Sequence, residues 1–88
     1  MFTALIADDE IVIREGLRDL FDWAAYGVTV IAEADDGEKA YQLVQELSPD
    51  IIVTDIVMPR LNGLDMVSRL RDNGNMSEII LISAYQDI

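Results

Sequence analysis

The feature that most constrains the fold is the alternation along the chain of short apolar runs with segments of helical periodicity. Four runs are typical of strands, because apolar residues occupy successive positions and turn or charged residues follow them. These runs are residues 2–7 (FTALIA), 28–34 (VTVIAEA), 51–55 (IIVTD) and 78–83 (EIILIS). Stretches such as IIV and IILI indicate strands that are buried on both faces, as in a parallel sheet covered by helices.

Three amphipathic helices are predicted between these strands. The first covers IVIREGLRDLF, the second begins after Asp36 as its N-cap, and the third runs from about Gly63 to Asp72. Their inward-facing apolar residues are expected to be Ile13, Leu17, Leu20 and Phe21 in the first, Ala40, Leu43, Val44 and Leu47 in the second, and Leu64, Val67 and Leu70 in the third. The resulting order, βαβαβαβ, predicts an α/β fold built on a doubly wound parallel sheet.

Acidic residues stand at the ends of two of these strands. Asp8 and Asp9 directly follow the first strand, and Asp55 ends the third. Open α/β sheets bind ligands beyond the carboxyl ends of their strands, so the three acids share one site if these two strands are neighbours. Two such charges about 4 Å apart repel by roughly 4 kcal/mol at an effective dielectric near 20, so the group needs a cation or a bound proton. Mg²⁺, a hard ion with oxygen ligands, meets that need.

Each of these acids also has a simpler interpretation. Asp8 and Asp9 could cap the first helix, and Asp55 could be an ordinary acid in the turn after a strand. The sequence DDGE, residues 35–38, also contains two acids before a helix, and we interpret it as a cap. Because Asp8, Asp9 and Asp55 end two strands that are expected to pair, a metal and phosphoryl site is the better interpretation for them.

Composition excludes several kinds of chemistry. The 88 residues include no cysteine and no histidine, so neither a thiolate nor an imidazole is available as a nucleophile, ligand or base. The net charge of -11 opposes the phosphate backbone of DNA, so we expect no direct contact with nucleic acid. The apolar runs are too short to span a membrane, and the N-terminus lacks the basic flank of a signal peptide. We therefore expect a cytoplasmic protein without a membrane contact.

The motifs IADDE, TDIVMPRLNG and LISA, in this order and spacing, resemble the receiver domain of bacterial two-component response regulators. The resemblance extends over the whole chain and implies a flavodoxin-like sheet with strand order 2-1-3-4. It implies that Asp55 accepts a phosphoryl group from a sensor histidine kinase. Asp9 would bind Mg²⁺ directly, Asp8 through water or as a second acid, and Val57 through its main-chain carbonyl. Ser83 would form a hydrogen bond with the phosphoryl group.

The end of the chain departs from the family pattern. A family receiver continues through a fourth helix, a fifth strand that ends in a lysine, and a fifth helix, whereas this chain stops at Ile88. Residues 1–88 are therefore expected to form only the N-terminal portion of a receiver domain. Without the lysine, phosphorylation would be slower or its coupling to conformational change lost. FDW and SAYQDI further resemble receivers joined to AraC-type helix-turn-helix output domains, which implies a transcription regulator whose DNA contacts lie outside this sequence.

The implied strand order leaves two other interpretations open. With right-handed crossovers, the first helix lies alone on one face, so apolar side chains of the third and fourth strands would meet water. Such a surface predicts a homodimer or higher assembly, or a marginal fold, and the chain could be an inert association module. A magnesium-dependent phosphohydrolase of the haloacid dehalogenase type is less favoured. Such enzymes carry a second aspartate two residues after the first, where this chain has Val57. At most, we expect the chain to catalyse its own phosphorylation and dephosphorylation.

Overall fold

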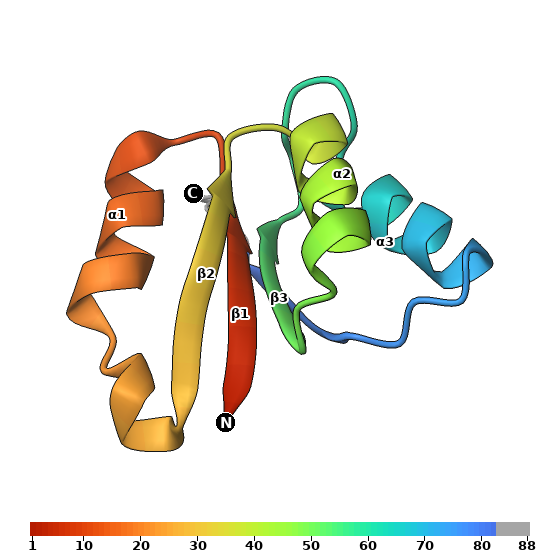
Figure 1. The fold of residues 1–88 in the computed structure, drawn as a ribbon. Coiled ribbons are helices and arrows are strands. Elements are labelled where there is room, and N and C mark those ends of the chain that lie inside the picture. The colour runs from red at the N-terminus through yellow and green to blue at the C-terminus, as the bar shows by residue number, and fades with distance from the viewer. Residues whose placement is uncertain (83–88) are drawn as a thin grey trace.

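The computed structural model describes residues 1–82, which form a four-stranded parallel sheet with helices on both faces (Figure 1). In chain order, the elements are β1 (Phe2–Ala7), α1 (Ile11–Leu20), the 3-10 helix η1 (Trp23–Tyr26), β2 (Val28–Ala34), α2 (Gly37–Leu47), β3 (Ile51–Asp55), α3 (Gly63–Asp72) and β4 (Glu78–Ile82). These bounds confirm the four predicted strands and three predicted helices. Ser83, which the sequence places at the end of the fourth strand, lies outside the described residues.

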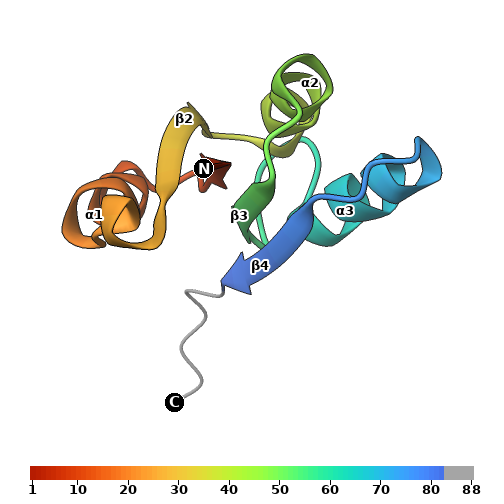
Figure 2. The ribbon, with the colours of Figure 1, turned by 60° about the horizontal axis from the view of Figure 1, so that its bottom comes forward.

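The strand order is β2-β1-β3-β4, and all neighbouring strands run parallel, as predicted. In the central pair, β1 and β3 run from Ala4 opposite Ile51 to Ala7 opposite Thr54. The carboxyl ends of these two strands therefore lie side by side. Viewed along the sheet, α1 lies on one side and α2 and α3 on the other, which confirms the expected division of the helices (Figure 2).

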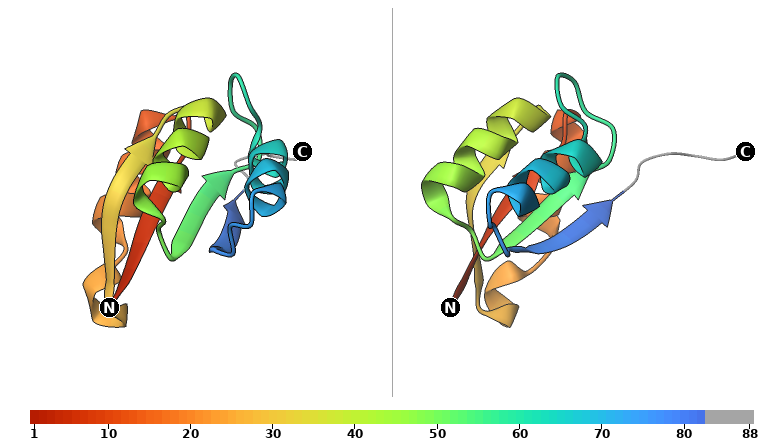
Figure 3. Two further views of the ribbon diagram at one scale, coloured as in Figure 1. Left: turned by 45° about the vertical axis from the view of Figure 1, so that its right-hand side comes forward. Right: turned by 90° about the vertical axis from the view of Figure 1, so that its right-hand side faces the viewer.

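The main core lies between the sheet and the two helices α2 and α3, which cover the same face (Figure 3). Its buried members are Leu5, Ala7, Ala34, Ala40, Val44, Ile52, Met58, Leu61, Met66 and Leu70. The predicted inward face of α3 is wrong at Leu64, which is 53% exposed, whereas Met66 is fully buried. Met66 and Leu70 are four residues apart and so share one side of the helix, and it is this side that faces the sheet.

On the opposite face of the sheet, α1 is the only α-helix among residues 1–82, and no residue of this helix is fully buried. Leu20, predicted to point inward, is 89% exposed. The expected exposure of the sheet on this side is confirmed for β4, where Ile80 is 49% exposed. It is wrong for β3, where Val53, which lines this face, is buried. The difference follows from position, because β3 lies between two strands and β4 at an edge of the sheet.

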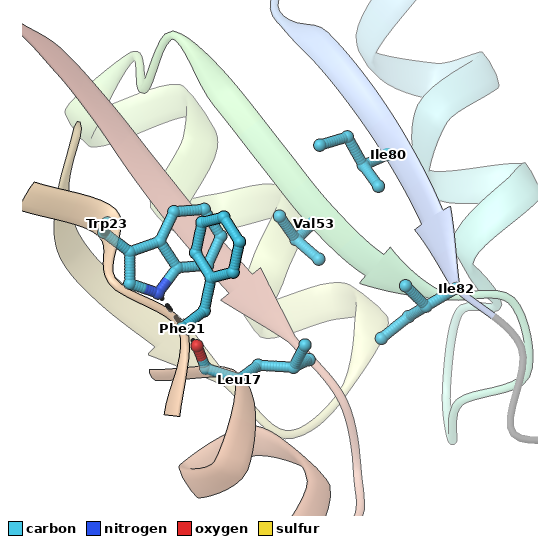
Figure 4. Close-up of a pocket in the computed structure, with 6 residues that line it drawn as sticks. All are labelled: Leu17, Phe21, Trp23, Val53, Ile80 and Ile82. Atoms are coloured by element: carbon cyan, nitrogen blue, oxygen red, sulfur yellow. Dashed lines mark hydrogen bonds between the residues drawn. The ribbon is translucent and has the colours of Figure 1, made fainter. Parts of the chain in front are cut away.

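An apolar hollow lies on this face between α1 and β4 (Figure 4). It is lined by Leu17, Phe21, Trp23, Val53, Ile80 and Ile82. At its α1 side, the indole Nε1 of Trp23 donates a hydrogen bond to the carbonyl of Leu17 at 2.8 Å, and the Phe21 ring packs edge-on against the indole. Trp23 therefore packs beyond the end of α1, on the border of the hollow. Among residues 1–82, no helix has the length and apolar character needed to cross a membrane.

Candidate functional site

Three carboxylates meet at the carboxyl end of the sheet, as the sequence predicts. Asp8 and Asp9 follow β1, and Asp55 is the last residue of β3. One carboxylate oxygen from each of the three lies within 4.8 Å of the other two. We call this group the acid cluster. The parallel pairing of β1 with β3 brings the acids together, because it places two strand ends at one edge of the sheet.

Asp8 is the most deeply buried member of the acid cluster, with 1% of its surface exposed. Its Oδ1 accepts a hydrogen bond from the main-chain N–H of Glu10 at 2.9 Å, whereas its buried Oδ2 has no hydrogen-bond partner among the described residues. Burial raises the pKa of the Asp8 carboxyl above its ordinary value. The Glu10 N–H lowers this pKa, and the negative charges of Asp55 and Asp9 raise it further. Asp8 therefore carries a buried acceptor that nothing in the described part of the chain satisfies.

Asp55 is held rigidly at the end of its strand. The residue is 7% exposed, and its Oδ1 accepts a long hydrogen bond, 3.4 Å, from the main-chain N–H of Val57. Gly63 at the start of α3 packs directly against the Asp55 carbonyl, since a Cβ atom built on this glycine would lie only 2.1 Å from that oxygen. The Gly63 N–H donates to the carbonyl of Ile56 at 2.7 Å. These contacts bring the backbone at Gly63 close to that of Asp55 and fix the main chain that carries the Asp55 side chain.

The other predicted site residues differ in what the structure shows of them. Asp9 is exposed at the mouth of the acid cluster, where solvent and a ligand have access. Val57 follows Asp55 in the same loop with 75% of its surface exposed. Ser83, expected to contact a phosphoryl group, lies outside the described residues. The DDGE segment does cap a helix as interpreted, because Asp36 Oδ1 accepts from the N–H of Lys39 at 2.8 Å.

Arg14, which is not among the predicted site residues, also supports the acid cluster. Its Nη1 donates to the main-chain carbonyl of Asp8 at 2.8 Å, and its Nε pairs with Glu33 at 3.2 Å. Glu33 also pairs with Arg18 at 2.9 Å. The guanidinium of Arg14 thus links the main chain of Asp8 to Glu33 in β2. A sequence signal existed, since Arg14 and Arg18 lie four residues apart on one side of a helix and Glu33 lies near the carboxyl end of the neighbouring strand.

Comparisons with known proteins agree with this architecture. The sequence profile of the response regulator receiver domain matches residues 4–88. A transcriptional regulatory protein of Staphylococcus aureus, HptR, is 41% identical over 88 residues, and an uncharacterized response regulatory protein of Staphylococcus epidermidis is 40% identical over 87. Both alignments cover 99% of this chain but 34% of the relative. The chain therefore spans about a third of the length of these curated relatives.

Solved structures show the same arrangement of strands and helices. The receiver domain of AraT, a response regulator from Geobacillus stearothermophilus, matches with a TM-score of 0.88 and 38% identity, covering 93% of this chain and 64% of that one. A CheX-CheY-BeF₃-Mg²⁺ complex from Borrelia burgdorferi matches with a TM-score of 0.84 and 30% identity, covering 98% of this chain and 64% of that one. From the site, the profile match and these likenesses together, we conclude that the chain belongs to the receiver domain family of bacterial two-component response regulators, which are regulatory domains rather than dedicated enzymes.

Proposed function

We propose that this chain is a phosphorylation switch in which Asp55 accepts a phosphoryl group. The observation that carries the proposal is the convergence of three carboxylates, one of which, Asp8, has a buried Oδ2 with no hydrogen-bond partner among residues 1–82. A cluster of this charge and burial is costly unless a cation shares it. Asp55 is both rigidly held and close to the other acids, as a nucleophile beside a metal must be.

The donor set of the acid cluster fits Mg²⁺, which prefers oxygen ligands. Asp9 would bind the ion directly, Asp8 would bind through water or as a second acid, and the oxygen of Asp55 and the main-chain carbonyl of Val57 would complete the protein ligands. The buried, unsatisfied Oδ2 of Asp8 supports this fit, because a bound ion or its water would supply the missing partner. When bound, Mg²⁺ would neutralise the phosphoryl oxygens and so lower the barrier to attack by an anion.

The chemical step requires little beyond positioning. A carboxylate oxygen of Asp55 attacks the phosphorus atom of a phosphohistidine on a sensor histidine kinase. A P–O bond forms while the P–N bond breaks, the electron pair of the P–N bond stays on the imidazole nitrogen, and that nitrogen takes a proton from water. The product is an acyl phosphate on Asp55. The N–H of Val57, which contacts Asp55 Oδ1 in the described structure, orients the nucleophile, and Ser83 would donate to the phosphoryl oxygens.

The wider role is proposed from the resemblance and from the relatives. The kinase would dock in the cytoplasm, and the phosphorylated chain would control a transcription-regulating output domain. Support comes from the Staphylococcus aureus relative, named a transcriptional regulatory protein, and from FDW and SAYQDI, which resemble AraC-type regulators. The likeness to a complex that contains Mg²⁺ and BeF₃ supports the ion chosen. Nucleic acid would be bound by the output domain, since the net charge of this chain is -11.

The proposal is tested by intact mass spectrometry after incubation with acetyl phosphate, with Mg²⁺ and with EDTA. The wild-type chain should gain one phosphoryl group in Mg²⁺ and none in EDTA. Asp55→Ala should gain none, and the exposed Asp35→Asn, which removes one charge elsewhere, should behave as wild type. A folded wild-type chain that gains no phosphoryl group would favour the alternative, an inert association module.

We also propose that the 88-residue chain by itself forms a homo-oligomer through the apolar hollow between α1 and β4. Ile80 is half exposed there, and β4 is an edge strand among the described residues. The charge of -11 repels a second copy, so association should strengthen as salt screens it. Sedimentation velocity tests this, and Ile80→Asp should dissociate the oligomer while Val12→Asp, outside the hollow, should not. A wild-type monomer at high concentration and high salt would refute it.

A further inference from the structure

The start of α2 packs against the loop that follows Asp55. We define residues 56–62, between β3 and α3, as the acceptor loop. The main-chain N–H of Gly37, the first residue of α2, donates to the carbonyl of Pro59 at 3.3 Å. The same carbonyl accepts the N–H of Leu61 at 2.8 Å. One oxygen of the acceptor loop is thus shared between the loop's own turn and a helix that comes earlier in the sequence.

Only a glycine fits at position 37. A Cβ atom built there would lie 1.6 Å from the main-chain oxygen of Leu61 and 2.5 Å from its carbonyl carbon. Real Cβ contacts stay above 3.0 Å, so the helix or the loop would have to move by the difference, about 1.4 Å. The obstacle is backbone rather than the end of a flexible side chain, and Leu61 is itself buried in the core. The loop therefore cannot yield by a change of rotamer.

A second contact joins the same two segments. Asp36, the N-cap of α2, uses Oδ1 to accept from Lys39, and its Oδ2 lies 3.5 Å from the Nε of Arg60 in the acceptor loop. Arg60 has a φ of 72°, in the left-handed region that a residue with a side chain rarely adopts. The loop thus has a strained backbone at the residue next to its contact with Gly37. Such a conformation persists only where the surroundings hold it.

We propose that Gly37 is a positioning residue for phosphoryl transfer, acting through the acceptor loop. Gly63 holds the far end of this loop against the Asp55 carbonyl, and Gly37 holds Pro59 and Leu61. Val57 lies between Asp55, which Gly63 contacts, and Pro59, which Gly37 contacts, and its N–H contacts the carboxylate of Asp55. The inference rests on the proposed function, because it assigns the loop a task only if Asp55 is phosphorylated. A displaced loop would misplace both the Val57 N–H and the carbonyl proposed to bind Mg²⁺.

The test compares Gly37→Ala with Gly16→Ala, a matched change in α1 where the added Cβ would meet only Leu20 Cδ1 at 3.9 Å. Circular dichroism first establishes that each variant is folded. The rate constant of phosphorylation by acetyl phosphate and the Kd for Mg²⁺ by calorimetry are then measured. Gly37→Ala should slow phosphorylation by roughly tenfold to hundredfold and weaken Mg²⁺ binding, whereas Gly16→Ala should change neither. A folded Gly37→Ala chain with wild-type values would overturn the inference.

If Gly37→Ala does not fold, the Asp36–Arg60 contact decides the question. Asp36→Asn keeps the capping oxygen and removes the charge that faces Arg60, while Asp35→Asn removes an equal charge from an exposed neighbour. Phosphorylation should be roughly twofold to fivefold slower in Asp36→Asn than in Asp35→Asn, and equal rates would overturn the inference. The two failures can be told apart. A wild-type chain that is never phosphorylated would refute the proposed function itself, whereas a wild-type chain and variants that are phosphorylated at equal rates would refute only the role of Gly37.

Discussion

Replacing Asp8 with asparagine should make the metal-free protein more stable and remove its response to Mg²⁺. Asp8 is 1% exposed, and its Oδ2 has no partner among the described residues. Its pKa is raised chiefly by burial and also by the charges of Asp55 and Asp9. The ionised carboxylate therefore costs folding free energy at neutral pH. Asparagine keeps the Oδ1 acceptor for the Glu10 N–H and carries no charge.

The expected size of the effect follows from the contacts of Asp8. A buried, unsatisfied acceptor costs about 1–3 kcal/mol. Repulsion between two carboxylates at 4.8 Å, the largest separation in the acid cluster, is about 3.5 kcal/mol at an effective dielectric near 20, and charge screening reduces it. We expect Asp8→Asn to raise the free energy of unfolding in EDTA by roughly 1–3 kcal/mol. At a Mg²⁺ concentration of about 100 times its Kd, the wild-type chain should gain about 2.7 kcal/mol and the variant much less.

Urea unfolding followed by the fluorescence of Trp23, the single tryptophan, provides the assay. Each protein is unfolded in EDTA and in Mg²⁺, and Asp35→Asn serves as the control for a general loss of negative charge. Two results would refute the reasoning. One is an Asp8→Asn variant less stable than wild type in EDTA, and the other is an equal gain from Mg²⁺ in both proteins.

Three further predictions concern the same molecule. The stability advantage of metal-free Asp8→Asn should be largest near neutral pH and vanish as the pH falls below 3.8, the ordinary pKa of this carboxyl, because the folded protein binds the proton of Asp8 more tightly than the unfolded chain does. Urea titrations at several pH values in EDTA check this, and a pH-independent difference would contradict it. Ser77→Ala should lower the free energy of unfolding, measured in urea, by about 1–3 kcal/mol, because the buried Oγ of Ser77 donates to a main-chain carbonyl at 2.6 Å. The control Ser68→Ala, at an exposed position, should change that free energy little. Met66→Ala should cost about 2–5 kcal/mol and Leu64→Ala clearly less, which thermal unfolding measures; equal losses would mean that α3 is turned differently from the structure described.

The acids could be predicted from the sequence because strand ends are visible in it. Asp8, Asp9 and Asp55 each end a run of apolar residues, and parallel strands bring such ends to one edge. The phase of α3 is harder to predict, because Leu70 is at helical spacing both from Val67, which is in the predicted set with Leu64, and from Met66. Only packing against the sheet selects Met66 and Leu70 as the buried pair.

Contacts between distant segments could not be predicted from local patterns. Arg14 supports the acid cluster and is itself held by Glu33, a partner 19 residues away on another element. The sequence indicates Gly37 only as part of a helix cap, because its close approach to Leu61 exists only once the acceptor loop lies against α2. Local chemistry identifies a cap or a turn, whereas the need for a glycine at one position depends on which backbone passes beside it.

The absence of fully buried residues in α1 has a consequence for local motion. The helix begins three residues after Asp8. Much of its attachment to the sheet consists of the ion pairs that Arg14 and Arg18 form with Glu33, together with the aromatic packing at its far end. An element with so little buried surface opens at a lower free energy than the strands beside it. Its amide hydrogens should therefore exchange with solvent before those of β1. Each such opening releases the Arg14 contact with the Asp8 carbonyl, so the acid cluster lies between a slowly exchanging strand, β1, and a helix that exchanges faster.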